Sequence, residues 1–324
     1  MKDAVVGIDI GGTFTKFGII DRVGTVIMEG SVPTDQTDDA DVYIAGLCDA
    51  IRKAINNLND LVNIKGIGIG APNGNYLNGS IEFAPNLKWA NGKVVHLVTL
   101  IQKQFAMPVA VTNDANAAAI GEMIYGGAKN VKDFILITLG TGLGSGVVVN
   151  GELVYGHDGF AGEIGHVRAR DNGRLCGCGR RGCLETYASA PGIKRTVFEL
   201  LAEYNGNSEL SRYTFDDLTS EIIYQAATRG DKIALEAFQI TGEILGVKLA
   251  DAVAHTAPEK IFLFGGLAKS GDYILKPVRE SFERNLLKIW QGKIAIELSS
   301  LAEGNVAILG ASALIWQELN KNEH

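Results

Sequence analysis

The sequence predicts a two-lobed α/β protein, and three observations support this prediction. The chain has 324 residues, a length typical of two domains. Short apolar runs alternate with segments of helical periodicity, which is typical of α/β folds. An order of apolar run, glycine turn, apolar run, glycine turn and apolar run occurs at 4–31 and again at 134–154. This repeated order predicts two related halves.

The first third of the chain predicts strands interrupted by helices. The expected strands are 4–10, 15–21, 25–32, 66–72 and 107–114. The expected helices are 41–58, 94–105 and 114–126. In the helix at 41–58, Cys48 lies on the apolar stripe, so we expect it to be a core residue and not a ligand.

The rest of the sequence predicts the second half of the protein, followed by a last segment that returns to the first half. Expected helices lie near 191–204, 215–228, 231–256, 273–287 and 304–320, and expected strands begin at 260 and at 293. We assign 1–112 plus 304–324 to a small N-terminal lobe, and 113–303 to a larger lobe. Because no low-complexity linker separates them, the boundary is expected to be a hinge of crossing chain.

Composition and charge exclude several classes of protein. The formal net charge is −7 and adjacent basic residues occur only as short pairs such as Arg180-Arg181, so we expect no nucleic-acid partner. There is no signal-peptide pattern and no apolar run of about 18 residues, so we expect a cytoplasmic protein without a membrane partner. Thiols stay reduced in that compartment, and clustered cysteines there bind metal more often than they form disulfides.

Three glycine-rich turns follow expected strands. In "DIGGTFTKFG", Asp9 ends a strand, Gly11 and Gly12 make the turn, and Thr13 offers a hydroxyl. Successive N–H groups in such a turn form an anion site, although a plain hairpin turn would look the same. The pattern is neither a P-loop nor a dinucleotide turn, because a strand follows it.

The other two turns are "LGTGLGSG" at 139–146 and "FGGLAKSG" at 264–271. Each is weak alone. Together, the three turns predict a nucleotide held in a cleft between the two halves.

At this point the chain resembles the ROK family of bacterial sugar kinases and regulators, within the superfamily of actin, Hsp70 and hexokinase-like ATPases. The motifs that carry the resemblance are "DIGGTFTKFGIID", "VTNDANAAAIGE", "ITLGTGLGSGVVVNGELVYG", "GFAGEIGH", "CGCGRRGCLETYAS" and "LFGGLA". The resemblance implies an actin-like fold of duplicated ribonuclease H-like domains, with a zinc-binding loop and a homodimer surface on the larger lobe. The wording of "GFAGEIGH" and "CLETYAS" is most similar to ATP-dependent glucokinases.

The resemblance also implies a binding site for ATP and Mg²⁺. The residues expected at the ATP phosphates are Gly11, Gly12, Thr13, Thr141 and Gly142. Asp9 is expected to hold Mg²⁺ through water, and Gly265 and Gly266 to lie near the adenosine. Lys16 is either a further phosphate contact or a solvated strand lysine.

The motif "TNDANAAAIGE" contains the expected catalytic residue, Asp114. An aspartate at a strand-to-helix junction suits the role of accepting the hydroxyl proton in phosphoryl transfer, although it could also simply cap the helix. The positive end of the helix dipole is expected to keep Asp114 ionised. By resemblance, the sugar contacts are Asn86, Asn113, Asp114, Glu163, His166 and Glu185.

His166, Cys176, Cys178 and Cys183 form the pattern H-x9-C-x-C-x4-C. One nitrogen and three sulfurs suit tetrahedral Zn²⁺. Four protein ligands leave no open position, so the predicted zinc is structural and the loop at 166–183 is its site. One imidazole nitrogen of His166 is expected to bind the metal while the other faces the sugar, and the sequence leaves open which is which.

The predicted function is ATP-dependent phosphorylation of a hexose 6-hydroxyl, with glucose as the first choice. Mannose, fructose, N-acetylmannosamine and N-acetylglucosamine stay open as acceptors, and polyphosphate as a donor. A sugar-responsive regulator is the alternative from another class. Regulators of the family carry an N-terminal DNA-binding domain, for which we expect no room before Asp9.

Overall fold

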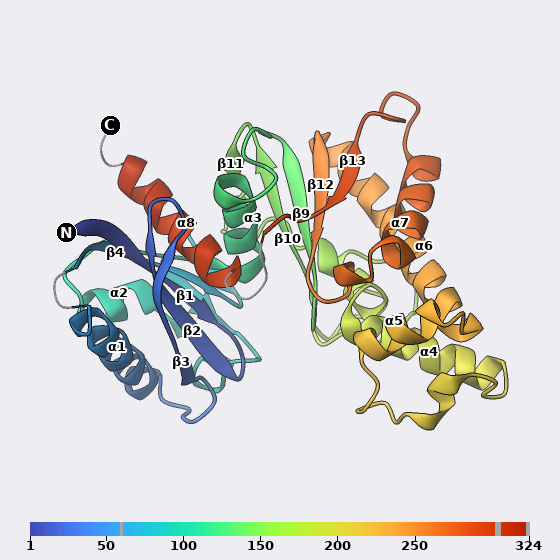
Figure 1. The fold of residues 1–324 in the computed structure, drawn as a ribbon, viewed down its shortest axis with the longest axis horizontal. Coiled ribbons are helices and arrows are strands. Elements are labelled where there is room, and N and C mark those ends of the chain that lie inside the picture. Colours follow the sequence, from blue (N-terminus) through green and yellow to red (C-terminus); the bar gives the residue numbers. More distant parts are fainter. Residues whose placement is uncertain (59–60, 302–305, 322–324) are drawn as a thin grey trace. The chain divides into compact units, whose positions relative to one another are not determined.

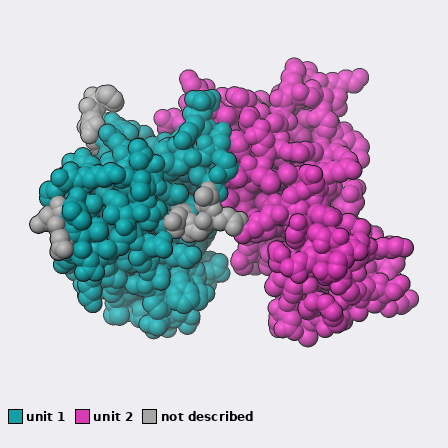
Figure 2. All heavy atoms as spheres, in the orientation of Figure 1, with its two compact units in different colours: residues 1–130, 153–162, 300–324 teal, residues 131–152, 163–299 magenta. Residues whose placement is uncertain are grey.

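A computed structural model describes residues 1–58, 61–301 and 306–321 of the chain (Figure 1). The chain forms two compact units (Figure 2). Unit 1 comprises 1–130, 153–162 and 300–324, and unit 2 comprises 131–152 and 163–299. Each unit is described by itself below.

Unit 1 is built on a five-stranded sheet in the order β3-β2-β1-β4-β8. Strands β1, β2 and β3 are antiparallel neighbours, whereas β4 and β8 run parallel to β1. Its strands are β1 Lys2–Ile10, β2 Phe14–Asp21, β3 Val26–Pro33, β4 Val62–Ala71 and β8 Val109–Asn113. A small second sheet contains β5 Gly74–Asn75, β6 Ser80–Glu82 and β7 Val94–Val95.

The helices of unit 1 cover both faces of the larger sheet (Figure 1). They are α1 Ala40–Asn56, η1 Lys88–Ala90, α2 Leu97–Gln102, α3 Asp114–Tyr125 and α8 Val306–Lys321. Alternate residues of β1, such as Val6 and Ile8, pack with α1 and α2 in one core. Val5 points to the other face and packs with residues of α3 and α8. This alternation is what a strand buried on both faces requires.

Helix α8 lies against β1 and β4 without room for side chains between the backbones. A Cβ at Gly7 would lie 2.1 Å from the carbonyl oxygen of Ile308, and one at Gly68 would lie 1.9 Å from that of Ala311. Glycine is therefore required beneath the helix for a steric reason, because the backbones approach so closely.

Unit 2 contains a second five-stranded sheet, in the order β11-β10-β9-β12-β13. Strand β10 is antiparallel to β9, while β12 is parallel to β9 and to β13. Its strands are β9 Phe134–Leu139, β10 Leu143–Val149, β11 Glu152–Leu153, β12 Lys260–Phe264 and β13 Ala295–Leu298. The sheet repeats the opening strand–turn–strand order of unit 1, as the sequence predicts.

The helices of unit 2 form a layer in which α6 contacts α4, α5 and α7 (Figure 1). They are η2 Ile164–His166, η3 Leu184–Thr186, α4 Ala190–Glu203, η4 Glu209–Arg212, α5 Ser220–Thr228, α6 Lys232–Thr256, η5 Ala268–Ser270 and α7 Asp272–Asn285. At Gly246, a Cβ would meet the carbonyl oxygen of Val278 at 2.5 Å, so α6 and α7 pack closely. Helix α7 continues through Pro277.

Most expected elements are present, and two helix starts differ. The helix expected from 94 begins at Leu97, because Val94 and Val95 pair with β6 instead. The helix expected from 215 begins at Ser220, where the Thr219 side chain accepts from the Ile222 amide as a cap. Cys48 lies in the core, as expected.

The division into units differs from the expected lobes, because 113–130, 153–162 and 300–303 belong to unit 1 and not to the larger lobe. Helix α3 belongs to unit 1, where it packs on α8, and a Cβ at Gly121 would lie 3.0 Å from Gly310 Cα. Of the expected segment 304–324, residues 304, 305 and 322–324 lie outside the described residues. Among the described helices, none is long and apolar enough to cross a membrane.

The packing of α8 predicts opposite effects for two glycine-to-alanine changes. Gly68→Ala places a methyl group against the Ala311 carbonyl and is expected to reduce the free energy of unfolding by about 3 kcal/mol. Gly46→Ala, in α1 where nothing lies within 4 Å of the new Cβ, is expected to increase it by about 0.5–1 kcal/mol. Urea unfolding of both variants checks this, and similar effects of the two changes would contradict the packing.

Candidate active site and metal centre

The first glycine turn joins β1 to β2 in unit 1. The Gly11 amide donates to the Phe14 carbonyl at 3.1 Å, and a Cβ at Gly11 would lie 2.8 Å from that oxygen. Gly12 and Thr13 at its tip are exposed. The turn is therefore narrow and free of side chains at Gly11, as an anion-binding turn requires.

Two predicted functional aspartates lie at one edge of the unit 1 sheet. Asp9 is near the end of β1, and Asp114 follows β8 as the first residue of α3. Because β1, β4 and β8 are parallel, their carboxyl ends share this edge. Ligands of α/β sheets bind outside this edge of parallel strands.

The pKa of Asp9 is raised to about 6. Burial of the carboxyl is the main cause of the rise, and the negative charge of Asp114 adds to it. Lys16, which pairs with Asp9 from the neighbouring strand β2, lowers the pKa. A buried carboxyl whose pKa is raised by a second carboxylate forms a site suited to a cation.

Burial also raises the pKa of Asp114, although its amide hydrogen bonds with the start of α3 act in the opposite direction. Asp114 is nonetheless an exposed residue, so solvent and ligands can reach it. The expected effect of the helix start is present, since its amides lower the pKa of Asp114, but burial outweighs it. A raised pKa makes Asp114 a stronger base.

Asn113 and Asn86 also lie in unit 1. Asn113 is the N-cap of α3, and its Oδ1 accepts from the Ala115 amide at 2.9 Å. Asp114 Oδ1 accepts from the same amide at 2.8 Å, so the two side chains are neighbours. The loop that carries Asn86 packs on the first glycine turn, where a Cβ at Gly12 would meet the Asn86 carbonyl oxygen at 3.3 Å.

In unit 2, the second and third glycine turns are adjacent. Thr141 and Gly142 lie between β9 and β10, with the Gly140 amide donating to the Gly142 carbonyl at 3.0 Å. Gly265 follows β12, has a φ of 102°, and would place a Cβ 2.7 Å from the Leu139 carbonyl oxygen. Gly266 is exposed with open space around it. The parallel pairing of β9 and β12 brings these two turns together.

The cysteine loop of unit 2 is a tight hairpin. Isolated bridges pair Arg168 with Cys183 and Leu175 with Arg181. Gly182 has a φ of 77°, and a Cβ there would lie 1.7 Å from the Arg170 carbonyl oxygen. The backbone can follow this path only with glycine at that position.

The hairpin gathers the four predicted metal ligands, His166, Cys176, Cys178 and Cys183. Their ligand atoms all lie within 4.8 Å of one another. The Sγ atoms of Cys178 and Cys183 are 3.7 Å apart, and Cys176 Sγ is 3.7 Å from His166 Nδ1. A tetrahedral zinc with Zn–S bonds of about 2.3 Å needs edges of about 3.5–3.8 Å, so the four residues fit such an ion.

The two ring nitrogens of His166 face different groups. Nδ1 faces the cysteine cluster, whereas Nε2 lies 3.9 Å from the Glu163 carboxylate. Burial raises the pKa of Cys176 to about 12, so the metal-free thiol is protonated and metal binding releases its proton.

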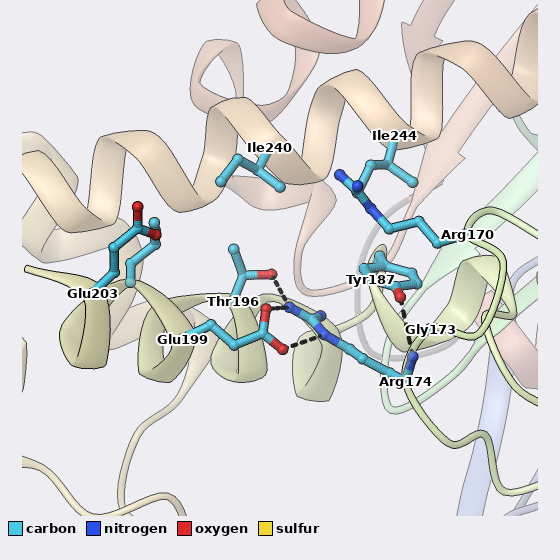
Figure 3. Close-up of a pocket in the computed structure, with 10 residues that line it drawn as sticks. Arg170, Gly173, Arg174, Tyr187, Thr196, Glu199, Glu203, Ile240 and Ile244 are labelled. Carbon is cyan, nitrogen blue, oxygen red and sulfur yellow. Dashed lines mark hydrogen bonds and ion pairs between the residues drawn. The ribbon is translucent and has the colours of Figure 1, made fainter.

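Arg174, to which the sequence analysis gave no role, fixes the cysteine loop to α4. Its guanidinium donates to both carboxylate oxygens of Glu199, at 2.8 and 2.6 Å, and to the carbonyls of Thr186 and Gly192. It also stacks on the Tyr187 ring, with 4.5 Å between Cζ and the centroid. Figure 3 shows Arg174 lying along α4. An arginine among glycines and cysteines gives no sequence signal, because its side-chain and backbone partners lie 12 to 25 positions along the chain.

A cavity of about 440 Å³ lies between the cysteine loop, α4 and α6 (Figure 3). Arg174 and Glu199 line it as an ion pair, with Ile240 and Ile244 of α6 opposite. None of the residues predicted to bind sugar or nucleotide lines this cavity.

Two groups of predicted residues thus lie on two units. Unit 1 carries the first turn, the aspartates, Lys16 and the two asparagines. Unit 2 carries the other turns, Glu163, Glu185 and the metal cluster. Within each unit the members are gathered at strand ends or on one loop.

A two-unit α/β fold with paired glycine turns, two carboxylates at a sheet edge and a Cys₃His cluster defines a class of phosphotransferases and related regulators. The ROK family model matches residues 5–318, and the chain belongs to the ROK family. This confirms the predicted family.

The chain is similar to kinases and to regulators of the family. It is 34% identical to a glucokinase of Halalkalibacterium halodurans, over 98% of this chain and 96% of that protein. It is 30% identical to a xylose repressor of Caldicellulosiruptor bescii, over 98% of this chain and 79% of that protein. The crystal structure of a ROK family glucokinase from Streptomyces griseus, in complex with glucose and AMPPNP, has a TM-score of 0.78 and 32% identity. It covers 97% of this chain and 99% of that one, which confirms the predicted fold class.

The raised pKa of Asp9 predicts a pH-dependent stability difference. Below the ordinary pKa near 3.8, the carboxyl is neutral in folded and unfolded chains alike. Between that value and about 6 the folded chain binds more protons, so stability falls as the pH rises. Asp9→Asn removes this loss, and in the absence of metal it is expected to be about 2 kcal/mol more stable than the unchanged protein above pH 7.

Urea unfolding in EDTA at pH 4 to 8 measures this difference. The gain of Asp9→Asn should shrink toward pH 4, while the exposed Asp35, changed to Asn, should produce no such trend. A gain that does not vary with pH would contradict the electrostatic origin.

Proposed function

We propose that the protein transfers the γ-phosphoryl group of ATP to the 6-hydroxyl of a hexose, with glucose as the preferred acceptor. The observation that carries the proposal is Asp114, a carboxyl of raised pKa at the start of α3, on the same sheet edge as Asp9. The similarity to glucokinases over nearly the whole length of both chains supports the same function. The bound AMPPNP of the related structure supports ATP as donor.

Asp114 has the role of catalytic base. Phosphoryl transfer through a loose transition state needs an acceptor for the hydroxyl proton, and the raised pKa makes Asp114 a competent one. Asn113 uses its Oδ1 to cap α3, so its amide NH₂ is left to donate to a sugar oxygen. Glu163, His166, Glu185 and Asn86 are proposed as further sugar contacts.

Asp9 is proposed to hold Mg²⁺ through water, which the neighbouring negative charges favour. Mg²⁺, when bound, neutralises charge on the transferring phosphates. Gly11, Gly12, Thr13, Thr141 and Gly142 are proposed to surround the phosphates, with Gly265 and Gly266 near the adenosine. Lys16 faces Asp9 across the strands and is a further candidate phosphate contact.

We also propose a structural zinc on His166, Cys176, Cys178 and Cys183. The ligand distances support it, and they support Nδ1 of His166 as the coordinating nitrogen. Nε2 then stays on the side of Glu163, where a sugar hydroxyl is proposed to bind. The homodimer implied by the family resemblance also stays a prediction.

The function predicts ATP-dependent conversion of glucose to glucose 6-phosphate by the purified protein. A coupled assay with ATP, Mg²⁺ and a panel of glucose, mannose, fructose and the N-acetylhexosamines is expected to give the highest kcat/KM for glucose. Polyphosphate in place of ATP tests the donor. Binding of sugar without turnover of any hexose would instead favour a regulator.

Asp114→Asn provides the control, because it keeps the size of the side chain and removes the base. It is expected to lower kcat by at least about 100-fold, in the range typical of a lost general base, while glucose still binds. Unchanged turnover in this variant would refute the role of Asp114.

The zinc site predicts about one zinc per chain by metal analysis. Cys183→Ala should lose the metal and about 3 kcal/mol or more of stability, because binding free energy contributes to folding. Cys48→Ala removes another buried thiol, outside the cluster, and should retain the zinc. Equal zinc content in both variants would contradict the proposed site.

A further inference from the structure

One carboxylate in unit 2 contacts both the cysteine cluster and the second glycine turn. Glu185 lies in η3, two residues after the ligand Cys183. Its Oε2 accepts from the Leu143 amide at 3.0 Å, and its Oε1 lies 3.6 Å from Cys176 Sγ. The two oxygens of one side chain therefore reach two sites that the sequence analysis treated separately.

The glycine at 142 is explained by this carboxylate. A Cβ at Gly142 would lie 2.5 Å from Glu185 Oε2, so any other residue there would displace the side chain. The need for glycine at this position thus follows from the approach of Glu185, whether or not a phosphate is bound.

Other contacts hold the turn to the same segment of chain. The Ala190 amide, at the start of α4, donates to the Gly140 carbonyl at 2.9 Å. On the opposite side, a Cβ at Gly165, next to the ligand His166, would lie 2.2 Å from the Leu143 carbonyl oxygen. The turn therefore contacts the backbone beside one metal ligand, His166, and the first residue of α4.

From these contacts we infer that Glu185 is a positioning residue, which couples occupancy of the cysteine cluster to the shape of the nucleotide-phosphate turn at Gly140–Leu143. The inference rests on the proposed function for the identity of the ligand. The Glu185 carboxylate accepts the hydrogen bond of the Leu143 amide and thereby fixes the turn. The neighbouring residues of the turn, Thr141 and Gly142, are proposed to face the phosphates. Metal bound by Cys176 and Cys183 holds the segment from which Glu185 reaches the turn.

The coupling predicts an effect on nucleotide binding that a contact with sugar alone would not produce. In the absence of sugar, Glu185→Ala is expected to bind AMPPNP with Mg²⁺ about tenfold more weakly, since a charge-assisted hydrogen bond to the turn is lost. AMP, which lacks the β- and γ-phosphates, should bind with unchanged affinity. Chelation of the metal from the unchanged protein should weaken AMPPNP binding as well. It should add little in Glu185→Ala, because the side chain that carries the coupling is already absent.

Two further variants separate positioning from sugar recognition. Glu185→Gln retains an oxygen that can accept from the Leu143 amide, so AMPPNP affinity should be restored to within about threefold while KM for the sugar still rises. Glu163→Ala, whose carboxylate lies on the Nε2 side of His166, should leave AMPPNP affinity unchanged. Both are measured by calorimetry on the zinc-loaded protein.

Hydrogen exchange tests the coupling without any nucleotide. Amides of the turn at 140–143 should exchange about tenfold faster in Glu185→Ala and in the chelated protein, and at the original rate in Glu185→Gln. Unchanged exchange in both Glu185→Ala and the chelated protein would overturn the inference. Failure of the unchanged protein to bind AMPPNP would refute the proposed function instead, and the exchange rates would still decide the coupling. If Glu185→Ala does not fold, the chelated protein and Glu185→Gln decide it.

Discussion

The close packing of α8 on the unit 1 sheet is the constraint on which that unit depends. Backbone meets backbone at Gly7 and Gly68, which leaves β1 and β4 no freedom to shift beneath the helix. These two strands end at the edge where Asp9 and Asp114 lie. The position of the proposed catalytic groups is therefore set by packing on the opposite side of the sheet from α1, well inside the unit.

In unit 2 the proposed site residues are fixed by contacts of turns and loops, and not by a helix packed on a sheet. Its turns are fixed by the end of β9, because Gly265 touches the Leu139 carbonyl and the Leu267 amide donates to the same oxygen. Its loops are fixed by polar contacts, with Arg174 tying the cysteine loop to α4 and Glu185 tying it to the turn. A loop-built site needs such supporting contacts, since loops lack the regular hydrogen bonding of strands.

Much of this could be predicted from the sequence, for identifiable reasons. Periodicity places strands and helices, and the cysteine spacing specifies a cluster, because both are local properties of the chain. The start of α2 could not be predicted, since Val94 and Val95 pair with a distant strand. The raised pKa of Asp114 could not be predicted either, because the helix start is visible in the sequence whereas the burial of its carboxyl is not. The contacts of Arg174 with Thr186 and of Glu185 with Leu143 join residues 12 and 42 positions apart, beyond the reach of any local pattern.

The metal cluster and the aspartates have different roles in the proposed reaction, and the charges around them explain the difference. The chain is acidic, with a net charge of −7, and the charge of Asp114 raises the pKa of Asp9 at the place proposed for a polyphosphate. Such a site is electrostatically unfavourable when empty and becomes favourable only with a divalent cation between carboxylate and phosphate. A Cys₃His cluster with four protein ligands offers no open position for such a role. Its contribution is therefore to geometry, through the backbone and through Glu185, while the charge of the phosphates is left to Mg²⁺ and to the amides of the glycine turns.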